Sequence, residues 1–259
     1  MRLLQTQKVT KYFGGLCALK EVSFNLEQGE VMGLIGPNGA GKTTLINIIS
    51  GAFHPSQGKV VYHGRDISRL KAHQINVLGI ARTFQVVRIF KRLTVLENVL
   101  TAMVDRSKEG PWKLVWGSFF KRVCAFKQDP EACATAEGLL ASVGLLRYRD
   151  EQAENLPYAM AKRLEIARAL ATRPKLLLLD EPSSGLNPAE QNEQIKIIRQ
   201  INEQGVTILI IEHVMKVIMD ISHRLIVLHY GEKIAEGTPK EVYSDPLVVE
   251  AYLGGEAHA

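Results

Sequence analysis

The chain has 259 residues, of which 46% are hydrophobic and 23% charged, a composition that excludes disordered and fibrous proteins. Its net charge of +5 leaves several partners open: phosphate ligands, nucleic acid, an anionic membrane surface, or none. No apolar run approaches the roughly 20 residues of a membrane-spanning helix, and no secretory signal is recognisable at the start. The three cysteines are scattered and suggest neither disulfides nor a metal site. We therefore expect a cytoplasmic, reduced protein.

Short strands dominate the first third of the chain. Apolar patterns predict strands at 3–9, 22–27, 31–35 and 58–64, and an apolar helix that follows the third strand and ends at Gly51. From about residue 86 helices replace the strands. Thr94 and Glu97 form a capping box, and Asp129 with Pro130 opens a helix that runs to Gly144.

Strands return at 175–179, 206–211 and 224–230, and helices are predicted from about Pro188 and after His213. Strands alternate with helices on both sides of a helical insert. This arrangement predicts a mostly parallel α/β core that carries a helical lobe.

Residues 36–43, GPNGAGKT, match the pattern G-x-x-x-x-G-K-[ST] in full, between an apolar strand and a predicted helix. Glycines allow backbone N–H groups to close around phosphates, and the helix N-terminus adds its positive dipole end. Lys42 would reach the β- and γ-phosphates, and the Thr43 hydroxyl would coordinate Mg²⁺. A glycine-rich turn that fits by chance is the weaker alternative. The predicted nucleotide-binding loop comprises Gly36, Pro37, Asn38, Gly39, Ala40, Gly41, Lys42, Thr43 and Thr44.

Acidic and polar residues follow the other strands. The apolar run at 176–179 delivers Asp180 and Glu181 at its carboxyl end, where one acid can hold the Mg²⁺ shell and its neighbour can polarise water. His213 follows another buried run and can bond a terminal phosphate or the attacking water, although a structural histidine is as common there. Gln85, in ARTFQ, could reach metal and water through its amide, but alone it indicates little.

The order of GPNGAGKT, ARTFQ, an IARAL helix, LLLLDEP and a strand-end histidine resembles the ATP-binding subunit of ABC transporters. The resemblance covers the whole chain and implies one P-loop NTPase domain. Its nucleotide-binding core would comprise residues 1–85 and 173–259, with an antiparallel β subdomain, and an α-helical subdomain would be inserted at about 86–172. It further implies a head-to-tail dimer that holds two ATP molecules.

By the same resemblance, Glu181 is the catalytic carboxylate, His213 is the switch histidine, and Gln85 links the metal to the helical lobe. Phe13 stands where the family stacks an aromatic ring on adenine, with Tyr12 as the fallback and core packing as the alternative for both. The segment SSGLNP at 183–188 corresponds to the cross-dimer loop, with Asn187 where many members have Asp.

Residues 155–170, NLPYAMAKRLEIARAL, match the signature segment, which serves the partner subunit's ATP. Pro157 replaces a phosphate-binding Ser, and Met160 replaces a Gln. A methyl at Ala159 is unfavourable if this backbone approaches phosphate or needs φ > 0. We therefore expect unequal ATP sites in a heterodimer. The residues predicted to contact ATP in trans are Leu156, Pro157, Tyr158, Ala159 and Met160.

The segments LTVLENVL and KIAEGTPKEVYSDPLVVEAYLG narrow the resemblance to branched-chain amino-acid importers, in particular to the larger of their two ATPase subunits. Relatives for amide or urea uptake are similar. This resemblance implies a peripheral protein at the cytoplasmic face of the membrane, bound to two permease subunits. A sister ATPase or a second copy would complete the dimer, a solute-binding protein would act indirectly, and nucleic acid is not expected as a partner. The remaining alternatives are a lipopolysaccharide-type exporter, a soluble ABC ATPase and a regulator that hardly hydrolyses ATP.

A basic, aromatic stretch spans residues 105–128 and contains Trp112 and Trp116. Such a segment is most often the core of a helical lobe, but it could also contact a permease helix or the membrane interface.

Overall fold

The computed structural model describes residues 1–103 and 127–253. The predicted contact role of the stretch 105–128 falls almost wholly outside these residues. The described chain forms two compact units: Met1–Arg82 with Lys175–Ala259, here called the sheet unit, and Thr83–Pro174, here called the helical unit.

The sheet unit contains an antiparallel sheet of four strands in the order β2-β1-β4-β5. Strands β1 (Arg2–Phe13) and β2 (Leu16–Glu27) form a long hairpin, and β4 (Gln57–Tyr62) pairs with the other edge of β1 and with β5 (Arg65–Asp66). Gly14 allows the tight hairpin turn because its φ of 57° lies in the left-handed region.

A second sheet of six strands has the order β10-β9-β3-β8-β7-β6. Every pair is parallel except β9 with β10. The strands are β3 (Val31–Ile35), β6 (Ile80–Arg82), β7 (Leu176–Asp180), β8 (Thr207–Ile211), β9 (Arg224–His229) and β10 (Glu232–Gly237). All residues of β3, β7 and β8 are buried, as in parallel strands covered on both faces.

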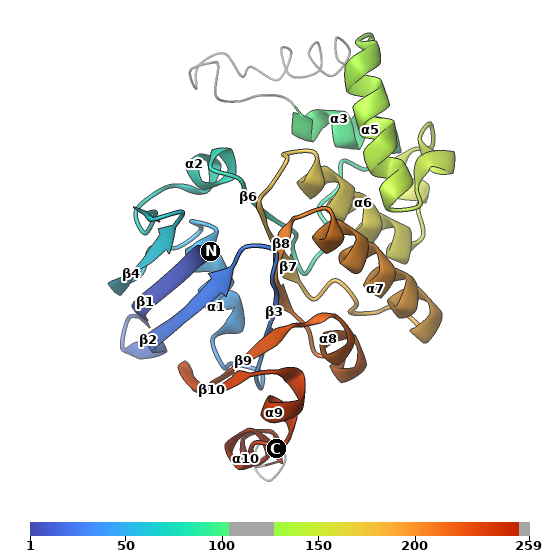
Figure 1. Cartoon of the computed structure of the whole chain (residues 1–259). Coiled ribbons are helices and arrows are strands. Elements are labelled where there is room, and N and C mark those ends of the chain that lie inside the picture. The colour runs from blue at the N-terminus through green and yellow to red at the C-terminus, as the bar shows by residue number, and fades with distance from the viewer. Residues whose placement is uncertain (104–126, 254–259) are drawn as a thin grey trace. The chain divides into compact units, whose positions relative to one another are not determined.

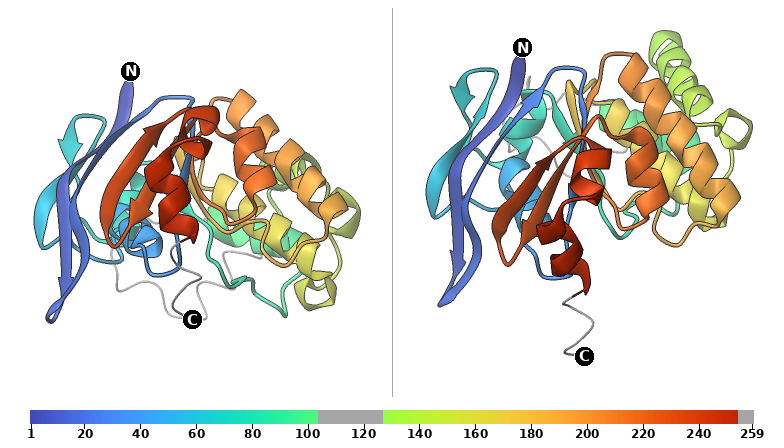
Figure 2. Two further views of the ribbon diagram at one scale, coloured as in Figure 1. Left: turned by 90° about the horizontal axis from the view of Figure 1, so that it is seen from below. Right: turned by 60° about the horizontal axis from the view of Figure 1, so that its bottom comes forward.

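Helices cover the sheets within this unit (Figure 1). Apolar side chains of α1 (Lys42–Ile49) share one core with both sheets, so this helix packs between them. Gly33 lets α8 (Met215–Ile221) approach β3, because a Cβ there would lie 2.8 Å from Ile218. Helices α9 (Pro239–Tyr243) and α10 (Pro246–Leu253) pack against β9 and β10 (Figure 2). The remaining helices of the unit are α2 (Ala72–Val77) and α7 (Pro188–Glu203).

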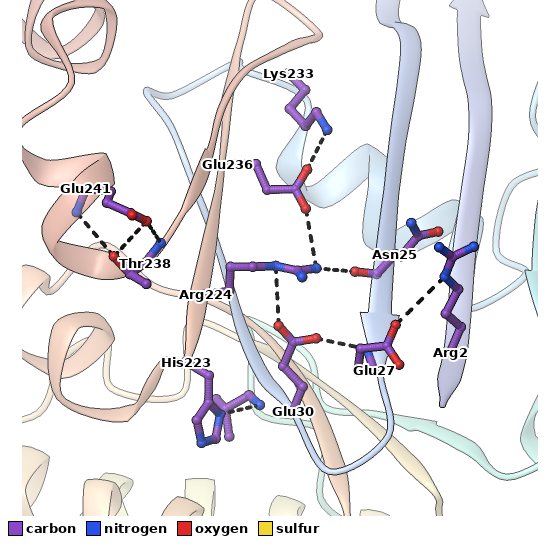
Figure 3. A network of polar contacts seen from close by, with 11 residues as sticks. Arg2, Asn25, Glu27, Glu30, His223, Arg224, Lys233, Glu236, Thr238 and Glu241 are labelled. Atoms are coloured by element: carbon purple, nitrogen blue, oxygen red, sulfur yellow. Dashed lines mark hydrogen bonds and ion pairs between the residues drawn. The ribbon is translucent and has the colours of Figure 1, made fainter.

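A polar network joins the two sheets away from the phosphate loop. Figure 3 shows the guanidinium of Arg224 between the carboxylates of Glu30, at 3.4 Å, and Glu236, at 3.3 Å, while it also donates to the carbonyl of Asn25. His223 accepts a hydrogen bond from the Val31 N–H at 2.9 Å. These contacts tie β2 and β3 to β9 and β10.

The helical unit comprises α3 (Val95–Met103), α5 (Pro130–Ser142) and α6 (Tyr158–Leu170), with 3₁₀ turns at Leu146–Tyr148 and Ala153–Asn155. The predicted capping box is present, because the Thr94 N–H bonds the Glu97 carboxylate at 2.9 Å and the Glu97 N–H bonds the Thr94 hydroxyl at 3.1 Å. Asp129 caps α5 as predicted. None of the helices within 1–103 and 127–253 has the length and apolar character needed to cross a membrane.

Candidate functional site

The loop 36–41 connects β3 to α1 and has the backbone geometry of a phosphate loop. Gly36, Gly39 and Gly41 have φ values of 148°, 79° and 100°. A Cβ at Gly36 would lie 2.1 Å from the carbonyl oxygen of Leu228, and one at Gly41 would lie 2.7 Å from that of Ala18. No side chain caps α1 at Gly41, so its first-turn N–H groups and positive dipole end face the loop.

Neighbouring strands hold this loop in place. The Gly231 N–H, in the turn between β9 and β10, bonds the Ala40 carbonyl at 3.1 Å, and the Lys20 N–H bonds the Gly231 carbonyl at 2.9 Å. Burial raises the pKa of Tyr252, in α10, and the nearby Gly36 N–H opposes that shift. The C-terminal helix therefore reaches the phosphate loop.

Lys42 is a nearly buried cation, with 6% of its surface exposed. Its ammonium donates to the carbonyl oxygens of Gly36, at 2.6 Å, and Pro37, at 2.8 Å. Burial lowers the pKa of Lys42, and the negative charges of Glu181 and Asp180 oppose that shift. The two acids thus act electrostatically on the lysine, which places all three groups at one site.

Asp180 ends β7 with only 2% of its surface exposed, and it forms an ion pair with Arg82 at 3.0 Å. The same guanidinium donates to the Asn47 side chain at 2.5 Å and to the Ser50 hydroxyl at 3.2 Å. Arg82, the last residue of β6, therefore links α1, which follows the phosphate loop, to the acid at the end of β7.

Glu181 and His213 form a close pair beyond the ends of β7 and β8. The His213 Nε2 lies 2.9 Å from a carboxylate oxygen of Glu181. Glu181 has a φ of 51°, an unfavourable conformation for a residue with a long side chain. Its N–H bonds the Ile211 carbonyl at 3.0 Å, which extends the ladder between β7 and β8 by one residue.

Glu212 precedes His213 and is 97% buried, with 3% of its surface exposed. Its carboxylate accepts the N–H of Ser183 at 2.7 Å and the N–H of His213 at 3.2 Å. Burial raises the pKa of Glu212, and the hydrogen bonds donated by Ser183, Val214 and His213 oppose that shift.

Phe13 ends β1 and is 41% exposed. It packs edge-to-face on Phe53 at 5.4 Å between ring centroids, and the Lys11 ammonium lies 5.0 Å from its centroid. Tyr12, the fallback residue, is 45% exposed. Both rings offer accessible surface for a planar ligand, so core packing does not account for either.

Gln85 lies in the helical unit, in the segment that follows β6. The buried carboxylate of Glu165, on α6, accepts the N–H groups of Phe84 and Arg88, both at 3.3 Å, and so brackets Gln85. Arg168, one turn further along α6, donates to the Arg88 carbonyl. Burial raises the pKa of Glu165, and these N–H bonds oppose the shift.

The signature residues begin helix α6 rather than a separate turn. Pro157 is the N-cap with no side-chain hydrogen bond, and the helix starts at Tyr158. Ala159 is not among the residues with positive φ, so the strain considered from the sequence is absent. Tyr158 is half exposed, whereas Ala159 is buried to 7% exposure. The ammonium of Lys162 lies 5.4 Å from the Tyr158 ring centroid.

The sequence therefore led to the central groups of the sheet unit but missed Arg82 and Glu212 as residues that hold them, and it missed Glu165, which holds the Gln85 segment within the helical unit. Glu212 carried a readable signal, since it follows the same apolar strand as His213. The arrangement places a lysine, two acids and a histidine beside a glycine-rich loop, which is suited to binding phosphates and activating water.

Residues 19–184 match the family described as ABC transporter, and residues 232–258 match the one described as branched-chain amino acid ATP-binding cassette transporter. The high-affinity branched-chain amino acid transport ATP-binding protein LivG of Salmonella typhimurium is 42% identical, over 97% of this chain and 98% of the relative. The corresponding protein BraF of Pseudomonas aeruginosa is 39% identical over the same shares.

Solved structures of ATP-binding cassettes are also similar to this chain in fold. An ATP-binding cassette of an ABC transporter in its ADP conformation superposes with a TM-score of 0.84 at 35% identity, over 98% of this chain and 99% of the other. A dimeric cassette in a post-hydrolysis state bound to ADP and Pi superposes with a TM-score of 0.75 at 26% identity, over 92% and 99% of the two chains.

Proposed function

Because this chain belongs to the ATP-binding subunits of ABC transporters, we propose that it binds and hydrolyses ATP to power the import of branched-chain amino acids. The observation that carries the proposal is the nearly buried Lys42 at the phosphate loop, on whose pKa the charges of Asp180 and Glu181 act. The match of residues 232–258 and the curated relatives support the class of solute.

In this proposal the loop 36–44 encloses the phosphates of ATP and Lys42 bonds its β- and γ-phosphates. Glu181 orients and polarises the attacking water, and His213, 2.9 Å away, fixes that carboxylate and bonds the terminal phosphate. Phe13 stacks on the adenine. Dimer closure adds contacts that only the ATP-bound state makes, and hydrolysis removes them.

The residues present also fit Mg²⁺, which prefers hydroxyl, carboxylate and amide oxygens. Thr43 and Asp180, both in the sheet unit, would hold it, and Gln85 is proposed as a further ligand. When bound, the ion would neutralise charge on the phosphates.

We further propose a dimer in which Leu156–Met160 contact the ATP bound to the other subunit. The dimeric structures of similar cassettes support the dimer itself. The second subunit would be a sister ATPase or a second copy, and two permease subunits would hold the pair at the cytoplasmic face of the membrane. A solute-binding protein would act through the permeases.

The test is reconstitution with the permeases, followed by ATPase assays with each solute-loaded binding protein. We expect branched-chain amino acids to stimulate hydrolysis, and Glu181→Gln to reduce turnover by about 10²–10⁴ while ATP remains bound in a persistent dimer. Unchanged hydrolysis in Glu181→Gln would refute the catalytic assignment. If only amides or urea stimulate ATP hydrolysis, the proposed class of solute is refuted but the proposed ATPase activity is not.

A further inference from the structure

We propose that Glu212 is a positioning residue for hydrolysis. Its buried carboxylate holds the backbone of His213 and the backbone of the segment after Glu181 in fixed positions relative to each other. The inference deepens the proposed function and rests on it. Neither the sequence motif nor the resemblance assigns Glu212 a role.

The first argument comes from where the strands end. Paired backbone groups align β7 with β8 up to Asp180 and Ile211, and the Glu181 N–H adds one more bond, to Ile211. The strand pairing ends at that point, so the ladder does not fix Glu181 against His213. The Glu212 carboxylate bridges the gap, with one oxygen on Ser183 N–H and the other on His213 N–H.

The second argument is that this position requires a carboxylate. Both carboxylate oxygens accept from backbone N–H groups of two different segments, whereas a carboxamide offers one acceptor and directs its NH₂ group at the second N–H. Ser183 is fully buried, so water does not replace the lost bond there. Charge-assisted bonds of this kind are among the stronger hydrogen bonds in proteins.

The third argument concerns the geometry that these bonds protect. Glu181 has a φ of 51° and its carboxylate lies 2.9 Å from His213, so both the backbone and the side chain of Glu181 depend on neighbouring contacts. Displacements of about 1 Å in a catalytic group reduce rates by about 10²-fold. Glu212 binds the backbone on both sides of this pair, and among the described residues no hydrogen bond or ion pair links it to the phosphate loop, so it acts through His213 and Glu181.

The experiment compares the wild type, Glu212→Gln and the matched control Glu241→Gln in the reconstituted transporter. Glu241 is also a carboxylate that accepts a backbone N–H, from Thr238 at 2.7 Å, but it caps α9 (Figure 3). We expect Glu212→Gln to lower kcat about tenfold with KM for ATP changed less than about twofold. The control should keep wild-type kinetics.

Two further readouts separate positioning from a general structural effect. In a His213→Ala background Glu212→Gln should cause a smaller fractional loss of kcat than in the wild type, because one of the two groups that it positions is gone. In the nucleotide-free chain, amide hydrogen exchange at Ser183 and His213 should accelerate about tenfold in Glu212→Gln. If that variant does not fold, Glu212→Asp, which keeps both oxygens and the charge, replaces it.

Wild-type kcat in Glu212→Gln, an equal fractional loss in the His213→Ala background, or unchanged exchange would overturn the inference and leave the proposed function intact. A wild-type protein that does not hydrolyse ATP would overturn the proposed function, and with it any hydrolytic role of Glu212.

Discussion

Replacing Arg82 by methionine removes a buried cation that binds three partners at once. Its guanidinium is 3.0 Å from Asp180 and also donates to Asn47 and Ser50 on α1. The two side chains of the pair are 11% and 2% exposed, so solvent screens the interaction little. Methionine fills a similar volume without charge, which isolates the polar contribution.

The geometry sets the expected magnitude. Across 3.0 Å the Coulomb attraction is about 5 kcal/mol at an effective dielectric constant of about 20. Removing one partner of a buried pair typically destabilises a protein by about 3–5 kcal/mol. We therefore expect Arg82→Met to lower the free energy of unfolding by about 4 kcal/mol. Arg82→Lys keeps the charge but lacks the planar fork, so it retains only part of that energy.

Urea unfolding followed by circular dichroism measures this effect, and a double-mutant cycle with Asp180→Asn isolates the coupling energy. The matched control is Arg2→Met, because Arg2 and Glu27 form an exposed pair at 3.9 Å, expected to contribute at most about 1 kcal/mol. A coupling energy below about 0.5 kcal/mol for Arg82 and Asp180 would refute the reasoning, since it would equal that of an exposed pair.

Three further predictions concern single groups. Gly36→Ala should abolish ATP binding, because its Cβ would lie 2.1 Å from the Leu228 carbonyl oxygen. Gly39→Ala, whose Cβ meets nothing within 4 Å, should weaken ATP binding by only about 1–3 kcal/mol, through backbone strain. Equal losses of ATP binding in the two variants would contradict this prediction. Burial raises the pKa of Tyr62 to about 12, above its ordinary value of 10.0. The unfolded chain therefore loses that proton first, and stability should fall between pH 10 and 12 by at most about 3 kcal/mol. Tyr62→Phe should remove this part of the pH dependence, and an unchanged slope would count against it. Ala159→Gly should lower the free energy of unfolding by about 1 kcal/mol and leave the ATPase rate of the assembled transporter unchanged, because the backbone at Ala159 is already regular helix. A raised rate would show instead that the methyl group weakens the site.

Much of the fold could be predicted because local signals and burial agree. The apolar runs that became β3, β7 and β8 are buried at every position, and the capping box at Thr94 lies where the sequence places it. Comparisons confirm the predicted family and fold class. The short elements β5 and α2, of two and six residues, were not predicted, since they contain too few residues to show a periodicity.

The residues of the candidate site also fall into those that the sequence predicted and those that it did not. The motif residues Lys42, Asp180 and Glu181 were predicted because each follows a recognisable apolar strand. Arg82 and Glu212 were not, because their roles depend on partners 98 and 29 positions away along the chain. No pattern within a window of the sequence encodes such a pair. The tertiary structure therefore adds the supporting residues rather than the reacting ones.

Helix α6 shows how the structure changes the interpretation of a departure from the family pattern. From the sequence, Ala159 was a concern because a methyl group is unfavourable at positive φ, but the helix already begins at Tyr158 and its backbone is regular there. With no side-chain hydrogen bond at the N-cap, the first-turn N–H groups and the helix dipole would bind phosphate in the proposed site, and these do not depend on a serine or a glycine. The same helix holds both sides of Gln85 through Glu165 and Arg168. Any displacement of α6 by phosphate at its N-terminus therefore moves the Gln85 segment with it. We expect the substitutions at Pro157–Met160 to change the affinity for phosphate more than the coupling between α6 and the Gln85 segment.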